Sequence, residues 1–237
     1  MDRYRYAILY HNYYSLDGID EMRQKISALD TPGILLLCSL PDKFAGSLPP
    51  QTAHEKFVIS PNLGKDIGGK LLLMQLLFSL APETPYTFLL HDKRSYQKQS
   101  GRWEKEGLFS ILEPEKLSAI TAAFDDDPNL GIACASGYIR NEYLGDGRFD
   151  TTNSDLLGEL MKQYAIPARH LRFVGGTMFC IRTALLRDFF PGYGALEVRA
   201  TLESGNVLDH EHGTRTHCWE RMLSWVATSA GYKIKEF

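Results

Sequence analysis

The sequence predicts an α/β protein in which helices cover both faces of a mainly parallel central sheet. Short runs that are apolar throughout alternate along the chain with longer segments of helical spacing. Strands that are apolar on both faces are typical of parallel sheets covered by helices on both sides. No repeat, low-complexity tract or long linker interrupts the 237 residues, so we expect a single domain over 1–237.

The first half of the chain contains four of the expected strands. They are the apolar runs Tyr6–His11, 33–40, 56–62 and 86–91. A helix is expected over 16–30, where apolar residues recur at helical spacing before Pro32 and Gly33. A second, strongly apolar helix is expected over 64–82, beginning with glycines and ending at Pro82.

The second half continues the alternation. An amphipathic helix is expected over 112–128 and a fifth strand over 130–136. The segment 171–190 predicts a loop or short strand, a glycine pair, another strand and then a helix. The last helix is expected over 216–231, and a terminal strand over 232–237.

Composition argues against several partners and compartments. The net charge of −3 gives no reason to expect nucleic acid as a partner. No apolar run approaches the ~20 residues that a membrane span needs, and the N-terminus lacks the apolar core of a signal peptide. The four cysteines are scattered without metal-ligand spacing. We therefore expect a cytoplasmic protein. The alternative is a protein attached peripherally to the inner face of the cell membrane.

Polar residues follow the fourth expected strand without any turn residue between them. His91, Asp92, Lys93 and Arg94 come directly after the buried run 86–90. In parallel α/β sheets, ligands bind at the carboxyl ends of the strands. The stretches HNYY after the first strand and NLGKD after the third should lie on the same edge. Asp92 could bind a metal, and His91, Lys93 and Arg94 could pair with phosphate. The alternative is a solvated, charged loop.

The stretch NLGKDIGG places polar residues and glycines where a loop enters a helix. Backbone amides at a helix N-terminus can bind phosphate, and glycine lets a ligand approach closely. Asn62, Gly64, Lys65 and Asp66 are therefore candidate ligand-binding residues. The spacing fits neither a P-loop nor a dinucleotide fingerprint. The alternative is a tight turn in which Asp66 complements the helix dipole.

Two further stretches, one acidic and one rich in histidine, are weaker candidates for a functional site. Asp125–Asp127 match an Asp-x-Asp pattern, but they end a helix and precede a strand, which places them at the opposite edge of the sheet. His210, His212 and His217 raise the hypothesis of a metal-dependent hydrolase, yet no zinc signature surrounds them.

The last helix carries a polar face. His217, Glu220 and Arg221 share this face by their spacing. A histidine and a glutamate so placed can act as a general base. The alternative is a surface ion-pair cluster with Arg221.

Taken together, five stretches resemble motifs of the rhamnan synthesis protein F family of bacterial polysaccharide glycosyltransferases. They are HNYYSLD, NLGKDIGG, LHDKRS followed by GRW, FVGGTMFCIR and HGTRTHCWER. They occur in the family's order and cover nearly the whole chain. Each departs from the family pattern. Lys65 replaces the family's Arg, Asp92 its Thr and Arg94 its Lys, while Cys180 replaces Trp and His212 replaces Asp.

The resemblance implies a Rossmann-like, GT-A-like nucleotide-diphospho-sugar transferase fold. The implied activity is that of an inverting glycosyltransferase of the hexosyltransferase class, in cell-surface polysaccharide synthesis. Its donor would be a nucleotide sugar, with dTDP-rhamnose or another deoxyhexose donor as candidates, and its acceptor a glycan. Other polysaccharide-synthesis enzymes are candidate partners. The competing hypothesis is a non-catalytic sugar- or nucleotide-binding module on the same fold.

The resemblance also assigns roles to residues. Glu220 takes the position of the catalytic acidic residue that the broader class places before the last helix and its trailing glycine, here Gly231. Beside it, His217 could orient the acceptor or hold Glu220 in place. The donor-binding residues would be His11, Asn62, Gly64, Lys65, Asp66, His91, Asp92, Lys93 and Arg94. Gly176, Met178 and Arg221 would contact the acceptor or support the site. The broader fold carries an Asp-x-Asp metal site after the fourth strand, where this chain has only Asp92, so Mg²⁺ or Mn²⁺ is expected to bind weakly or not at all.

Overall fold

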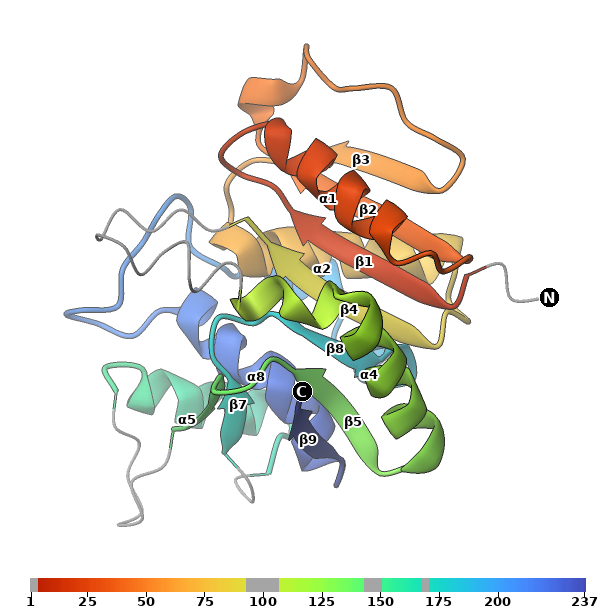
Figure 1. The fold of residues 1–237 in the computed structure, drawn as a ribbon. Helices are drawn as coiled ribbons and strands as arrows, with labels where there is room; N and C mark the ends of the chain where they lie inside the picture. The colour runs from red at the N-terminus through yellow and green to blue at the C-terminus, as the bar shows by residue number, and fades with distance from the viewer. Residues whose placement is uncertain (1–3, 93–106, 143–150, 168–170) are drawn as a thin grey trace.

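The computed structural model describes residues 4–92, 107–142, 151–167 and 171–237. A seven-stranded sheet forms its centre, in the order β3-β2-β1-β4-β8-β5-β9 (Figure 1). In that order the strands are Glu55–Ile59, Ile34–Leu40, Tyr6–His11, Tyr86–His91, Phe179–Arg182, Leu130–Cys134 and Lys233–Glu236. All neighbours pair in parallel except β8, which runs antiparallel to both β4 and β5. The expected mainly parallel α/β sheet is confirmed.

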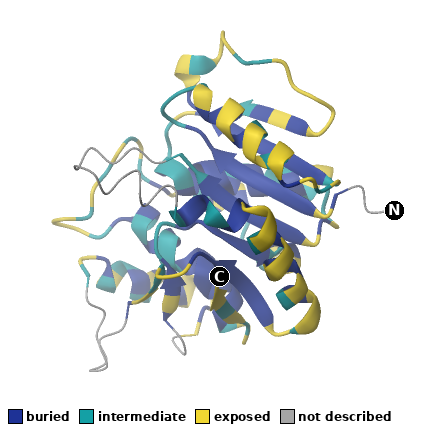
Figure 2. Ribbon diagram, in the orientation of Figure 1, coloured by how far each residue is buried: buried dark blue, intermediate teal, exposed yellow. Residues whose placement is uncertain are grey.

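Helices cover the two faces of the sheet because alternate strand residues point to opposite sides. Along β1, Ala7 and Leu9 join the core beneath α2 (Lys65–Leu80) and α8 (Arg215–Ser229). Tyr6, Ile8 and Tyr10 of the same strand join the core beneath α1 and α4. Helix α1 spans Asp17–Ala28 and α4 spans Pro114–Asp126. The inner strands of the sheet are therefore buried on both faces, as Figure 2 shows, whereas the edge strands β3 and β9 are partly exposed.

Several elements were not predicted from the sequence. Helices α5 (Ser154–Gln163) and α7 (Ala195–Ala200) lie in segments with no assigned structure, as does β6 (Ile139–Asn141). Strand β6 pairs with β7 (Arg172–Val174) in a separate two-stranded sheet. The segment 171–190 folds as expected into β7, a glycine turn, β8 and helix α6 (Thr183–Phe189). Among the described helices, none has the length and apolar character needed to cross a bilayer.

The order of strands reverses between β1 and β4. From β1 the chain moves outward to β2 and β3, and β4 then pairs with the other side of β1. Such a reversal leaves a crevice at the carboxyl ends of the two strands, where open α/β sheets bind ligands. His11 and His91 end these strands and are aligned in register. The fold therefore brings two of the predicted site residues together at its switch point.

Candidate functional site

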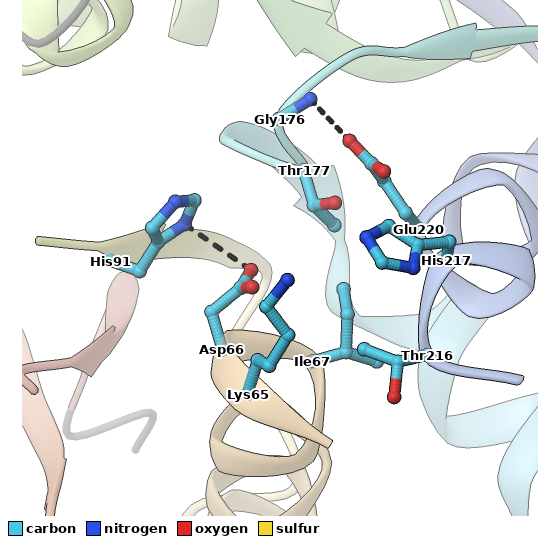
Figure 3. A pocket seen from close by; sticks show the side chains of 9 residues that line it. All are labelled: Lys65, Asp66, Ile67, His91, Gly176, Thr177, Thr216, His217 and Glu220. Carbon is cyan, nitrogen blue, oxygen red and sulfur yellow. Dashed lines mark hydrogen bonds and ion pairs between the residues drawn. The ribbon is translucent and has the colours of Figure 1, made fainter. Parts of the chain in front are cut away.

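Two adjoining cavities lie at this edge of the sheet. Both are bounded by Lys65, Asp66 and His91, which we call the shared wall. The tyrosine cavity, of about 250 Å³, is further lined by His11, Tyr13, Tyr14, Asn62, Asp92 and Asn206. The glutamate cavity, of about 180 Å³, is further lined by Ile67, Gly176, Thr177, Thr216, His217 and Glu220 (Figure 3). The expected convergence of the strand-end residues is thus confirmed for His11, Asn62, Asp66, His91 and Asp92.

The shared wall rests on a buried lysine. Lys70 has 0% of its side chain exposed, and its ammonium donates to the Asp66 carboxylate at 2.8 Å. It also lies 3.0 Å from Nδ1 of His91 and donates to the carbonyl oxygen of Thr177 at 2.9 Å. Since an ammonium has no lone pair, it is the donor in its contact with the ring nitrogen. Lys70 therefore ties helix α2 to β4 and to the turn before β8.

The charge of Asp66 is stabilised by these neighbours. Burial by itself raises the pKa of the Asp66 carboxyl, but the Lys70 ammonium 2.8 Å away holds that pKa well below its usual range. Asp66 is therefore an ionised group whose charge is already compensated by the protein. Sequence reasoning missed Lys70, although its i, i+4 spacing from Asp66 in an otherwise apolar helix was a visible signal.

His11 is a buried neutral group. Burial lowers the pKa of His11 to about 4, and its Nδ1 lies 2.8 Å from the hydroxyl of Ser39. Helix α2 can pack this closely on the ring because residue 69 is glycine, where any Cβ would collide with the imidazole. At neutral pH, His11 therefore offers polar atoms but no positive charge to a ligand.

Asp92 holds the loop after β1. Its two carboxylate oxygens accept the backbone N–H groups of Tyr13 at 2.9 Å and Tyr14 at 2.7 Å. Its own N–H donates to the carbonyl of His11 at 3.0 Å. The sequence suggested Asp92 as a metal ligand. In the structure its carboxylate instead binds the backbone amides of Tyr13 and Tyr14. Lys93 and Arg94, the expected phosphate partners, lie outside the described residues.

The backbone is left-handed where the chain enters α2. Gly64 (φ +73°) and Lys65 (φ +51°) both adopt this conformation, and a Cβ at Gly64 would collide with Leu202. The Lys65 ammonium donates to the carbonyl of Val207 at 3.0 Å and lines both cavities. Lys65 thus places a positive charge beside both cavities.

Asn62 lines the tyrosine cavity but not the glutamate cavity. Its amide nitrogen donates to Asn206 Oδ1 at 3.0 Å and to the Tyr13 hydroxyl at 3.3 Å. Its Oδ1 is buried and has no hydrogen-bond partner among the residues that the structure describes. Buried polar atoms are nearly always paired, so this oxygen is a ready acceptor for a ligand donor.

Glu220 enters the second cavity from helix α8. Its Oε1 accepts the N–H of Gly176 at 2.8 Å, and its Oε2 pairs with the Arg221 guanidinium at 2.9 Å. Arg221 also pairs with the buried carboxylate of Glu142 at 3.0 Å. The expected grouping of His217, Glu220 and Arg221 is present, but Glu220 is held by Gly176 and Arg221 rather than by His217.

His217 is held in place by the N-cap residue of its own helix, α8. Thr214, the N-cap residue of α8, accepts the backbone N–H of His217 and lies 2.6 Å from its Nδ1. Its Nε2 is 3.9 Å from Asp209. Burial lowers the pKa of His217, and the opposing effect of Asp209 is smaller. His217 is therefore a neutral, oriented group beside Glu220.

The remaining predicted residues have structural or peripheral positions. Met178 is fully buried in the core with α1 and α4 and lines neither cavity. His210, Glu211 and His212 are exposed. Over the described part of the chain, no group of three or more His, Cys, Asp and Glu side chains is placed to hold a metal ion. Asp125 accepts from the hydroxyl of Tyr86 at the start of β4, so the Asp125–Asp127 stretch lies at the opposite edge, as predicted.

Comparisons with known proteins add little about activity. No family model matches the chain. The chain is similar to "Uncharacterized protein WxcX" from two strains of Xanthomonas campestris pv. campestris, at 28% identity in each case. Each alignment covers 96% of this chain and 32% of the relative. The chain thus spans about a third of the length of the curated relatives it matches.

Proposed function

We propose that the protein is an inverting glycosyltransferase with a GT-A-like fold, transferring a sugar from a nucleotide-diphosphate donor to a glycan. The observation that carries the proposal is the pair of adjoining cavities at the switch point of the sheet. One contains tyrosines and amide groups, the other a glutamate and a histidine. The five motifs that resemble the rhamnan synthesis protein F family all contribute residues to these cavities or to the strands and helices beside them.

The tyrosine cavity suits the nucleotide. Tyr13 and Tyr14 offer aromatic faces, and the unpartnered Oδ1 of Asn62 can accept a hydrogen bond from a base or ribose. The diphosphate would lie along the shared wall, where Lys65 supplies a positive charge. Lys70 already compensates the charge of Asp66, which reduces the repulsion that this carboxylate would exert on the phosphates.

The glutamate cavity suits the reaction. The acceptor oxygen would attack the anomeric carbon of the donor as its proton passes to the Glu220 carboxylate. The bond from that carbon to the diphosphate oxygen breaks, and the diphosphate leaves with the electron pair. Attack opposite the leaving group inverts the anomeric centre. His217, one turn earlier on the same helix face, would hydrogen-bond the acceptor.

A divalent cation would add charge neutralisation at the diphosphate. In the described residues, only Asp92 stands where the broader fold places its metal ligands, and its carboxylate binds the Tyr13 and Tyr14 amides. We therefore expect donor binding to depend weakly on Mg²⁺ or Mn²⁺. Full loss of activity in EDTA with recovery in Mn²⁺ would contradict this expectation.

The test combines binding and turnover. A nucleotide sugar such as dTDP-rhamnose should raise the unfolding temperature of the wild type. At a ligand concentration of 100 times Kd, the free energy of unfolding should increase by about 2.7 kcal/mol. Glu220→Gln should retain donor binding, because a glutamine carbonyl can still accept the Gly176 N–H, and lose at least ~100-fold in turnover. Glu211→Gln, at an exposed position outside both cavities, is the matched control and should keep full turnover.

A second function, a non-catalytic sugar- or nucleotide-binding module, has one observation in its favour. Both oxygens of Glu220 already bond to protein groups, Gly176 and Arg221. In such a module these contacts would only fasten α8 to the turn before β8. Wild-type protein that binds a nucleotide sugar but neither hydrolyses nor transfers it, across a panel of glycan acceptors, would establish this function instead.

A further inference from the structure

Thr177 carries a buried hydroxyl without a partner. The residue lies in the turn between β7 and β8, is 1% exposed and lines the glutamate cavity. Its Oγ1 has no hydrogen-bond partner in the described structure. In Figure 3 this oxygen is turned toward the side of the cavity that holds His217 and Glu220. Buried hydroxyls are nearly always paired, so this exception requires an explanation.

The backbone at Thr177 is also unusual. Its φ of +52° lies in the left-handed region, which β-branched residues rarely adopt. Neighbouring contacts impose this conformation: the Thr177 N–H donates to Val174, and its carbonyl accepts from Lys70 at 2.9 Å. Gly176 before it also has a positive φ, and its N–H donates to Glu220.

The turn would therefore form with less strain if residue 177 were glycine. A threonine there adds a side chain that forms no hydrogen bond in the described structure. Strained residues of this kind occur where the surrounding structure fixes them for a function.

We propose that the Thr177 hydroxyl is a specificity determinant that hydrogen-bonds a hydroxyl group of the donor sugar. This inference rests on the proposed function and extends it to the sugar subsite. A hydroxyl both donates and accepts, so it matches the hydroxyls of a neutral sugar ring. The cavity of about 180 Å³ is more than ten times the volume that a single water requires. It also places Thr177 together with Glu220, the proposed base, so the sugar would be held next to the group that reacts.

The position of Thr177 predicts which part of the donor it affects. It lines the glutamate cavity but not the tyrosine cavity, which we assign to the nucleotide. Removal of the hydroxyl should therefore weaken binding of a nucleotide sugar and leave binding of the bare nucleotide diphosphate unchanged. A residue that only shapes the turn would affect both ligands alike, through the stability of the fold.

The experiment compares Thr177→Val and Thr177→Ser with the wild type. Valine keeps the branched shape and loses the hydroxyl, whereas serine keeps the hydroxyl. Isothermal titration with dTDP-rhamnose and with dTDP measures the two affinities. We expect Thr177→Val to bind dTDP-rhamnose about 5- to 10-fold more weakly, to bind dTDP as the wild type does, and to unfold at the same or a higher temperature. Thr177→Ser should stay within about 2-fold of the wild type for both ligands.

Two results would overturn the inference. The first is Thr177→Val that binds dTDP-rhamnose with unchanged affinity, which leaves the proposed function intact. The second is Thr177→Val that unfolds at a lower temperature and loses affinity for both ligands equally, which makes the hydroxyl a structural group. Wild-type protein that binds none of a panel of nucleotide sugars would instead refute the proposed function, and the sugar subsite with it.

Discussion

Lys70→Met tests the buried charge beneath the two cavities. The substitution keeps the volume of the side chain and removes its ammonium. The Asp66 carboxylate would lose its contact at 2.8 Å, and the Thr177 carbonyl its donor at 2.9 Å. Removal of one member of a buried ion pair costs about 3–5 kcal/mol, because the other charge is left uncompensated. Lys70 is 0% exposed and Asp66 retains some solvent contact, so we expect a loss near 3 kcal/mol.

The assay is urea unfolding followed by tryptophan fluorescence, since Trp219 and Trp225 are both buried. Lys56→Met is the control, because Lys56 is exposed on β3 and its replacement should change stability by less than about 0.5 kcal/mol. In the double variant Lys70→Met/Asp66→Asn, the unpaired charge is gone, and we expect stability to recover by about 1–3 kcal/mol. Lys70→Met with a loss below ~1 kcal/mol, or a double variant that is additive, would refute the assigned role of this pair.

Two further predictions concern the tyrosine cavity. Asp92→Asn removes the charged acceptor of the Tyr13 and Tyr14 amides and so loosens the loop that lines the tyrosine cavity. The affinity for dTDP should therefore fall by the same factor with and without Mn²⁺. A fall seen only with Mn²⁺ would make Asp92 a metal ligand instead. For pH, His11 has a folded pKa of about 4, below its ordinary value of 6.5, so the unfolded chain binds the proton more readily. The free energy of unfolding should therefore drop as pH falls from ~6.5 to ~4, by up to about 3 kcal/mol from this group. His11→Gln should flatten the slope and leave the part due to His217, whose pKa is also lowered by burial. An unchanged slope would contradict the burial of a neutral His11 ring.

The sheet and the edge that carries the two cavities were predictable because both depend on local pattern. Apolar runs marked the strands, and parallel strands put their carboxyl ends on one edge, so His11 and His91 were expected on the same edge; the pairing of β1 with β4 then makes them neighbours. The antiparallel direction of β8 was not predictable, since strand direction depends on pairing across the sheet and not on composition. Helix α5 was missed although Leu157, Leu160 and Met161 do recur at helical spacing.

The roles of individual site residues were less predictable than their positions. Asp92 directly follows an apolar run, and this position correctly placed it at the edge of the sheet. Its partners are backbone amides in the loop after β1, and the sequence gives no sign of that contact. Lys70 lies within an apolar helix, where a single lysine usually marks the solvent side of the helix. Its burial follows from three partners on α2, β4 and the turn before β8, and these meet only in the folded chain.

The contacts of Glu220 bear on how it could act as a base. Each carboxylate oxygen carries two lone pairs, so the bonds from Gly176 and Arg221 leave one on each oxygen for an acceptor hydroxyl. These bonds also fix the direction in which the remaining lone pairs point. Arg221 is anchored independently, by the carboxylate of Glu142, which is 3% exposed. The guanidinium would therefore stay in place when Glu220 takes up a proton, and Glu220 would return to the same orientation when the proton leaves. In the proposed reaction, Arg221 would thus be a fixed partner of Glu220, and Glu142, which lies outside all five motifs, would be the residue that anchors Arg221.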